Sequence, residues 1–237
     1  MLNDKPWRID WVLRLLMGIL ACLALSILIV QGYRSVLDPA AGSPPLWVTL
    51  TGTLTSQGIG FLLIDIFLRK HQVTWSEAFG LKSPNSGRAL LLALVVGMFV
   101  VPISWSLTKL SILIFEWLHI SPKLQDSVQA LQMADTTTQR VYFAVVAILI
   151  APIFEELVFR GILYPTLKRY GSMRLGLWGS SIFFGMIHMS ATAFVPLTLL
   201  AVVMCLLYET TGTIVAPIVT HAFFNAANYT YLIFSKS

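Results

Sequence analysis

Seven long apolar stretches, separated by short polar segments, dominate the pattern of this chain. A helix needs about 20 mostly apolar residues to cross a lipid bilayer, and most of the stretches reach or approach that length. The stretches are Trp11–Gly32, Leu46–Leu68, Ala89–Leu110, Val141–Leu163, Leu175–Met189, Val195–Tyr208 and Ile214–Phe234. We therefore predict an all-α fold, a polytopic transmembrane helical bundle of about seven spans.

The fifth and sixth stretches are short and are separated only by Ser190–Phe194. We interpret them as a hairpin of two spans, with a single long or broken segment as the alternative. The third stretch can continue to Leu118. We expect it to kink near Pro102, because proline removes a helical hydrogen bond.

The composition agrees with a membrane protein and excludes other classes. Hydrophobic residues make up 57% of the 237 residues and charged residues only 11%, against about 25% charged in soluble domains. The net charge is +5, and no basic cluster with interleaved aromatic residues predicts nucleic-acid binding. Cys22 and Cys205 both lie in apolar stretches, which is typical of small buried residues rather than of a disulfide.

Lysine and arginine gather in alternate loops, which sets the expected orientation. One set of loops holds Lys5, Arg8, Arg69, Lys70, Lys82, Arg88, Lys168, Arg169 and Arg174. The intervening loops hold fewer charges of mixed sign: Arg34, Asp38, Lys123, Asp126, Asp135 and Arg140. Because cytoplasmic loops carry the excess of lysine and arginine, we predict a cytoplasmic N-terminus and, with seven spans, an outer C-terminus.

Several residues near the span ends have simpler expected roles. Asp65 and Arg69 are four residues apart and are expected to form a local ion pair. His71 and His119 lie at helix ends and are expected to be solvated. Tryptophan and tyrosine side chains near the span ends are expected to anchor the helices at the membrane interface.

Polar side chains deep inside the apolar stretches concentrate in the last hundred residues. They are Glu155, Glu156 and Arg160 in the fourth stretch, His188 in the fifth, and His221 and Asn225 in the seventh. An ionisable side chain inside a span costs at least about 2.5–3.5 kcal/mol, so such residues are candidates for function. A purely structural role, as ion pairs or as hydrogen bonds between helices, is the alternative.

These side chains are expected at similar depths in the membrane. Glu155 lies thirteen residues before the cytoplasmic Lys168, His188 lies thirteen residues after Leu175, and Asn225 lies thirteen residues after Gly212. At 1.5 Å per residue these positions are about 20 Å along their helices, and His221 is about 14 Å along. We therefore expect an active site between the fourth, fifth and seventh helices.

The spacing within each helix separates the roles of the side chains. Glu156 and Arg160 are four residues apart and can pair on one face, whereas Glu155 is rotated by about 100° and is free to face the histidines. His221 and Asn225 likewise share a face. A carboxylate near imidazole and carboxamide groups can activate water and stabilise an oxyanion. The same carboxylate and histidines can instead bind a divalent metal such as zinc, and the residue types leave both mechanisms open.

Three short motifs resemble those of the CAAX-protease and bacteriocin-processing (CPBP) family of membrane peptidases. Residues 155–160, Glu-Glu-Leu-Val-Phe-Arg, resemble its EExxxR motif. Residues 184–188, Phe-Gly-Met-Ile-His, match FxxxH, and residues 221–225, His-Ala-Phe-Phe-Asn, match HxxxN. The resemblance covers about residues 141–234, so we divide the chain into N-terminal helices with an outer loop, residues 1–140, and a peptidase core, residues 141–234.

The resemblance implies roles for the motif residues. Glu155 is the expected base that activates water together with His188. His221 and Asn225 are expected to bind the oxyanion, or His221 to help hold a metal. Glu156 and Arg160 are expected to form a supporting pair that fixes the helix.

The family includes prenyl endopeptidases that remove the last three residues of prenylated proteins, and bacterial relatives linked to bacteriocin maturation or self-immunity. We therefore expect an intramembrane endopeptidase whose partners are a peptide or protein substrate and the lipid bilayer, in a bacterial inner membrane. A catalytically silent scaffold or immunity protein is one alternative, although no motif residue is lost. A proton-coupled transporter is another, although no inverted repeat is evident.

Overall fold

The computed structural model describes residues 5–33, 35, 44–82, 86–121, 125–134 and 136–234, and these form helices joined by short turns, with no strand among them. The α-helices are α1 (Ile9–Gly32), α2 (Leu46–Thr53), α3 (Ile59–Lys70), α4 (Trp75–Phe79), α5 (Ser86–Trp117), α6 (Asp126–Gln132), α7 (Thr137–Val145), α8 (Ala151–Glu156), α9 (Tyr164–Tyr170), α10 (Met173–Ile187), α11 (Ala191–Thr211) and α12 (Val215–Phe234). The predicted all-α class is confirmed.

Three π-helical turns join some of these helices into longer runs. They are η2 (Leu54–Gly58), η3 (Val146–Ile150) and η4 (Leu157–Leu163). The first joins α2 to α3, and the other two join α7, α8 and α9 into one run from Thr137 to Tyr170. Such turns frequently mark functional sites, and two of them flank the Glu-Glu pair of the fourth predicted span.

Within the described residues, five helices or helical runs are long and apolar enough to cross a membrane. They are α1, the run from α2 to α3, α5 from Gly87, the run from α7 to α9, and α11. The chain is therefore an integral membrane protein. The fifth and seventh predicted spans, α10 and α12, are not among these five. Helix α10 has only 15 residues, and α12 carries several polar side chains. The count of seven spans stays a prediction.

The fifth and sixth stretches form two helices packed as a hairpin, as predicted, and their both spanning the membrane stays a prediction. Helices α10 and α11 pack against each other and are joined by a turn at residues 188–190, where Met189 has a positive φ of 49°. Helix α5 continues to Trp117 through Pro102, close to the extension expected from the sequence.

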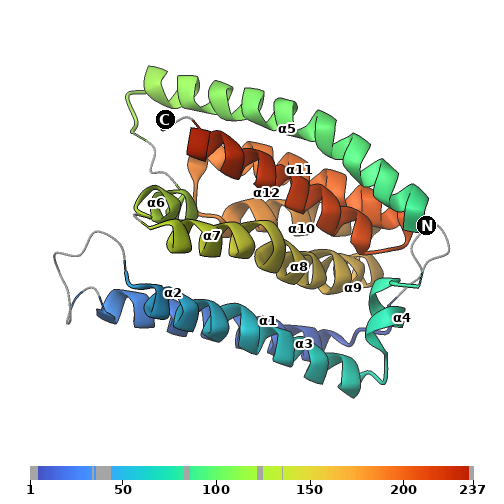
Figure 1. Ribbon diagram of the computed structural model, residues 1–237. Coiled ribbons are helices and arrows are strands. Elements are labelled where there is room, and N and C mark those ends of the chain that lie inside the picture. Colours follow the sequence, from blue (N-terminus) through green and yellow to red (C-terminus); the bar gives the residue numbers. More distant parts are fainter. Residues whose placement is uncertain are drawn as a thin grey trace.

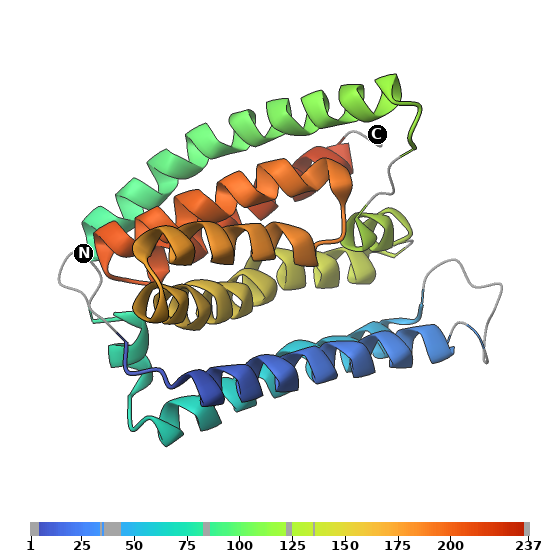
Figure 2. The same cartoon turned by 180° about the vertical axis from the view of Figure 1, so that it is seen from behind.

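The helices are arranged in layers (Figures 1 and 2). Helix α1 packs against α2 and α3 to form one outer layer, and α5 lies on the opposite side, in contact with α11 and α12. The run from α7 to α9 and helix α10 lie between them. Helix α4 and the N-terminus are at one end of the bundle, whereas α6 and the C-terminus are at the other.

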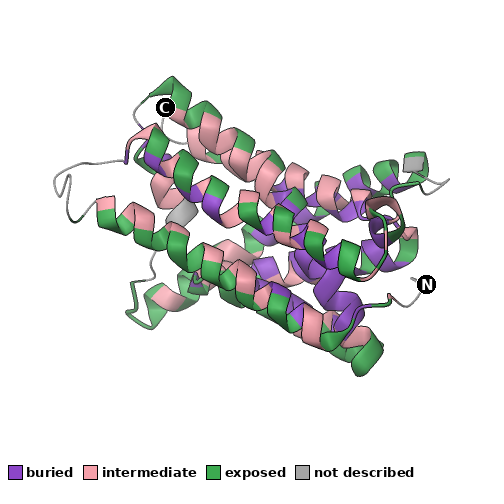
Figure 3. Cartoon of the chain, turned by 90° about the horizontal axis from the view of Figure 1, so that it is seen from below, coloured by how far each residue is buried: buried purple, intermediate pink, exposed green. Residues whose placement is uncertain are grey.

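Burial is uneven along the bundle. Buried positions gather toward the end where the N-terminus lies, and exposed positions cover the outer faces (Figure 3). Many of the exposed side chains are large and apolar, including Leu13, Met17 and Leu20 on α1. A soluble protein rarely exposes so much apolar surface, so these faces are the ones that lipid covers.

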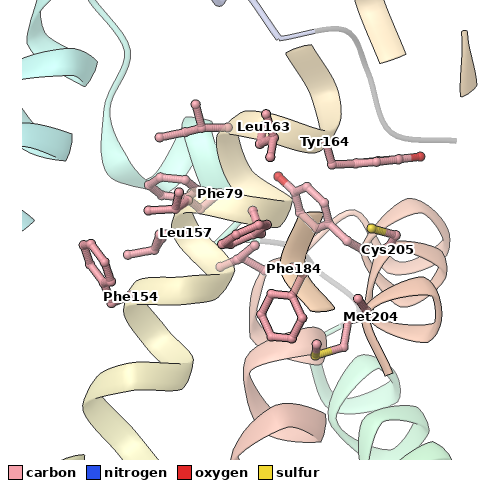
Figure 4. Close-up of a cluster of buried hydrophobic side chains, with 14 of the residues drawn as sticks. Phe79, Phe154, Leu157, Leu163, Tyr164, Phe184, Met204 and Cys205 are labelled. Atoms are coloured by element: carbon pink, nitrogen blue, oxygen red, sulfur yellow. The ribbon is translucent and has the colours of Figure 1, made fainter. Parts of the chain in front are cut away.

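Close contacts at glycines fix how the elements dock. The core cluster in Figure 4 includes Phe79 from α4 and Phe154 from α8. A Cβ atom on Gly60 of α3 would lie 2.5 Å from Phe154, and one on Gly161 of η4 would lie 2.4 Å from Phe79. Only glycine permits these approaches, so α3 and α4 both lie directly against the run that carries the Glu-Glu pair.

The simpler expectations for the span ends have mixed outcomes. Arg69 Nε donates to Asp65 Oδ2 at 2.6 Å, which confirms the local pair. His119 is exposed as predicted, but His71 is half-buried and accepts a hydrogen bond from the backbone of Arg8. The interface role is wrong for Trp7, whose side chain is fully buried. Both errors have one cause: the segment before α1 folds back against the end of α3.

Candidate active site

Three elements position the six polar residues of the motifs. Glu155 and Glu156 end α8, and Arg160 follows one turn later in η4. His188 is the C-cap residue of α10, and His221 and Asn225 lie on successive turns of α12. Helix α12 contacts both α8 and η3, and α10 contacts η4, so the three elements meet around the end of α8.

Glu155 lies between the two histidines. Its Oε2 atom is 3.9 Å from Nε2 of His188 and 3.9 Å from Nε2 of His221. That oxygen is buried and has no hydrogen-bond partner among the described residues, although the side chain as a whole is 24% exposed. The structure therefore brings Glu155, His188 and His221 together, with an unsatisfied carboxylate oxygen at the centre.

Glu156 points the other way, into the protein, and pairs with Arg160. Arg160 Nη1 donates to Glu156 Oε1 at 3.0 Å, and both side chains are almost completely buried. The arginine also lies over the ring of Phe184, 4.5 Å from its centroid. The structure thus shows the pair that the spacing predicts, and the aromatic ring offsets part of the cost of burying the cation.

The sequence reasoning missed a second partner of Glu156. The Oε1 atom that accepts from Arg160 also lies 2.8 Å from Nδ1 of His221. This contact depends on how α12 is rotated relative to α8, and no spacing within one helix reports that rotation. Glu156 therefore orients His221 directly, in addition to pairing with the arginine.

Both histidines are oriented through Nδ1. His188 Nδ1 lies 2.7 Å from the carbonyl oxygen of Phe184, which can only accept, so Nδ1 carries the proton. This carbonyl is available because the last carbonyls of a helix lack backbone partners, and His188 caps the end of α10. We assign the Nδ1 proton of His221 in the same way, toward Glu156. Each ring then presents Nε2 toward Glu155.

Asn225 donates a hydrogen bond to a backbone carbonyl that lacks its usual helical donor because of a proline. Its Nδ2 donates to the carbonyl oxygen of Ala147 in η3 at 2.7 Å. In this π-helical turn the N–H of Ala151 bonds to the carbonyl of Val146, five residues earlier. The next residue, Pro152, has no N–H for the carbonyl of Ala147, so the asparagine supplies the missing donor. Asn225 thus ties α12 to the run that carries Glu155, and one of its two Nδ2 hydrogens is used in doing so.

The arrangement does not match a zinc site as it stands. Tetrahedral ligands at zinc bond lengths lie about 3.4 Å apart, whereas Glu155 is 3.9 Å from each histidine. Among the residues that the structure describes, no group of three or more histidine, cysteine or acidic side chains is arranged to hold a metal ion.

The fold and this site together define a membrane protein with a cluster of carboxylates and histidines between its helices. Residues 137–227 match the family described as type II CAAX prenyl endopeptidase Rce1-like. The matched segment begins with α7, ends within α12 and includes all six motif residues. Neither the curated proteins nor the solved structures gave a match. The match covers less than half of the chain, and it shows that this segment is similar to the membrane proteases of that family.

Proposed function

We propose that the protein is an intramembrane endopeptidase in which Glu155 activates a water molecule to cleave a peptide bond. The observation that carries the proposal is the unsatisfied Oε2 of Glu155, 3.9 Å from each histidine Nε2. Polar atoms separated by more than about 3.5 Å are commonly bridged by water. One water between these three atoms can donate one hydrogen to Glu155 and the other to His188.

In the first step the water loses a proton to Glu155 and its oxygen attacks the carbonyl carbon of the substrate. His188 accepts a hydrogen bond from the same water through Nε2, because its Nδ1 proton is engaged by the carbonyl of Phe184. Both contacts fix the water so that its lone pairs point away from Glu155. General base catalysis of this kind contributes about 10²–10⁴-fold to the rate.

In the second step the C–N bond breaks, and Glu155 returns its proton to the leaving nitrogen. The products are a carboxylic acid, which ionises, and an amine, and the carboxylate of Glu155 is regenerated. We assign the stabilisation of the tetrahedral oxyanion to the second Nδ2 hydrogen of Asn225 and to Nε2 of His221, which donates when the ring is an imidazolium with protons on both nitrogens. His221 is held for this role by Glu156, and Asn225 by the carbonyl of Ala147.

The substrate that we propose is a membrane-associated peptide, either prenylated or a leader peptide, that approaches from the membrane or its cytoplasmic face. Two features support this class. The matched family acts on prenylated CAAX proteins, and Glu155 and His188 are partly exposed, at 24% and 15%, whereas Glu156 is enclosed.

The decisive experiment compares cleavage of prenylated and unprenylated peptides by the purified wild type, Glu155→Gln and Glu116→Gln. Glu116 is an exposed glutamate near the end of α5, far from the site in the chain, and provides the matched control. We expect Glu155→Gln to lose at least about 10²-fold in kcat, while Glu116→Gln cleaves like the wild type. Equal cleavage by all three would remove Glu155 as the base, and no cleavage by the wild type would contradict the peptidase.

The same assay separates the two ways of activating water. We expect cleavage to survive a strong chelator, because the mechanism uses side chains only. Loss of cleavage on chelation, with recovery on adding zinc, would instead show that Glu155 and the histidines draw together around a metal.

A further inference from the structure

The residues before α1 form a strap across the end of the bundle. We call residues 5–8 the N-terminal strap. Trp7 at its centre is fully buried, with its ring 5.1 Å from that of Phe67 and 5.3 Å from that of His71. The backbone N–H of Arg8 donates to His71, Lys5 Nζ donates to the carbonyl of Glu77, and Arg169 and Tyr170 donate to the carbonyls of Lys5 and Trp7.

The most important contact between this strap and η4 is a hydrogen bond from the indole of Trp7. Trp7 Nε1 donates to the carbonyl oxygen of Gly161 at 3.0 Å. In an α-helix that carbonyl would accept from the residue four positions later, which is Pro165 and has no N–H. The buried carbonyl of Gly161 thus gets its donor from a residue 154 positions away in the sequence.

Gly161 directly follows Arg160 and so belongs to the hydrogen-bonded chain that orients the site. Arg160 binds Glu156, and the same oxygen of Glu156 lies 2.8 Å from Nδ1 of His221. His221 in turn lies against Glu155. A shift of η4 by a fraction of an ångström would therefore displace His221, and with it the contact between His221 and Glu155, because the groups between them are buried and hydrogen-bonded.

We propose that Trp7 is a positioning residue for the reaction, which holds η4 in register through the carbonyl of Gly161. The inference rests on the proposed function, because it assigns Trp7 a role in that same site. Without the indole N–H the buried carbonyl of Gly161 would have no donor at Pro165, and the cost of leaving it unpaired favours a shift of η4 toward another donor. The indole N–H removes that incentive, and the strap thereby couples the N-terminal segment to the catalytic geometry.

The test replaces Trp7 by phenylalanine, which keeps an aromatic ring but has no N–H. The matched control is Trp75→Phe, at the same end of the bundle. Its Nε1 donates to Asp65 Oδ1 at 2.9 Å and not to the site-bearing run. We expect Trp7→Phe to lower kcat about tenfold with KM unchanged, and Trp75→Phe to leave both unchanged. A pure loss of folded protein would lower the titrated amount of active enzyme, not its kcat.

A second variant supplies the missing donor from inside the helix. Alanine at position 165 has an N–H that can bond to Gly161, so Trp7→Phe combined with Pro165→Ala should recover most of the lost kcat. Pro165→Ala alone should cleave like the wild type, because the carbonyl of Gly161 can accept from both donors. This rescue separates the hydrogen bond from the bulk of the indole ring.

A readout without cleavage keeps this inference distinct from the peptidase proposal. Amide hydrogen exchange across residues 157–163 should be about tenfold faster in Trp7→Phe than in the wild type, and should return in the double variant. Unchanged exchange and kcat in Trp7→Phe would overturn the inference, as would the same changes in Trp75→Phe or a failure of the rescue. Absence of cleavage by the wild type would count against the proposed function only, since the exchange result stands without it.

Discussion

At the scale of single residues, the fully buried ion pair between Glu156 and Arg160 carries a large desolvation cost. Each charge has lost its water, and the pair is held by one hydrogen bond of 3.0 Å and by the ring of Phe184. Glu156 Oε2 and two of the guanidinium nitrogens have no hydrogen-bond partner among the described residues. Such a pair contributes little to stability as a whole, but removing one partner leaves the other charge buried and alone.

This predicts an asymmetry between two variants. Arg160→Met should lower the free energy of unfolding by about 3–5 kcal/mol, because it leaves the Glu156 carboxylate uncompensated. The double variant Glu156→Gln with Arg160→Met should be more stable than that single variant, since glutamine is neutral and keeps an acceptor for His221. Reversible unfolding in mixed micelles measures both. A double variant that is no more stable than the single one would contradict this account.

The sequence predicts much of the site at this scale because depth and rotation along one helix follow from counting residues. The expected convergence of Glu155, His188 and His221 needs only helix length and position in the membrane. The bond from His221 to Glu156 and that from Asn225 to Ala147 depend on the rotation of α12 against its neighbours. That rotation is set by packing between helices, which no count along one helix contains.

At the scale of elements, two left-handed glycines join α4 to the start of α12. Gly80 follows α4 with a φ of 66°, and Gly212 follows α11 with a φ of 68°. The backbone N–H of Ile214 donates to the carbonyl of Phe79 at 2.9 Å, directly between them. This junction fixes where α12 begins, and therefore where His221 lies along it.

The two glycines differ in their surroundings and provide a matched test. A Cβ atom on Gly80 would lie 2.0 Å from the carbonyl oxygen of Gly212, whereas one on Gly212 would meet nothing within 4 Å. Gly212→Ala should therefore cost only the left-handed backbone penalty of about 1–2 kcal/mol. Gly80→Ala should cost the same backbone penalty and about 1–3 kcal/mol more, because its Cβ atom overpacks the junction. Equal changes in unfolding free energy for the two variants would show that α4 is not packed as described.

The helices themselves are predicted from the sequence more completely than the junctions between them. Apolar length and breaks predict the α10–α11 hairpin and the extent of α5. The π-helical turns and the strap have no such signal. They form where a carbonyl left without a donor by a proline, or the space left by a glycine, is filled by a residue far away in the chain. Trp7 illustrates this, since tryptophan near a span end usually lies at the membrane interface, and only the folded chain shows it buried.

At the scale of the whole molecule, the buried core lies toward one end and so do the structural ties between distant segments. Lys168 Nζ bonds to Glu209 Oε1 at 2.7 Å, joining α9 to α11, and the hydroxyl of Tyr164 donates to the same carboxylate. The N-terminal strap closes this same end. The other half of the bundle has more exposed helical surface, so we infer that the well-packed end holds the site rigid within a lipid-covered scaffold (Figure 3).

Lysine and arginine side chains are distributed unevenly over the two ends of the bundle. The end that carries α4 and the N-terminus also carries Lys70, Lys82 and Arg169, and the bias of lysine and arginine places such an end in the cytoplasm (Figure 1). Gln72 lies at this end after α3, and His119 lies after α5 toward the other. Both are exposed and have nearly the same left-handed φ, 55° and 57°, which makes them a matched pair for cysteine substitution.

A membrane-impermeant thiol reagent distinguishes the two positions. In intact cells His119→Cys should react and Gln72→Cys should not, and both should react once the membrane is permeabilised. Cys22 and Cys205 lie within α1 and α11, and the unsubstituted protein measures their background. The reverse labelling would invert the orientation and place the strap and the well-packed end outside. Labelling of both positions from the same side would mean that α5 does not cross the membrane, which its 32 residues and its apolar surface argue against.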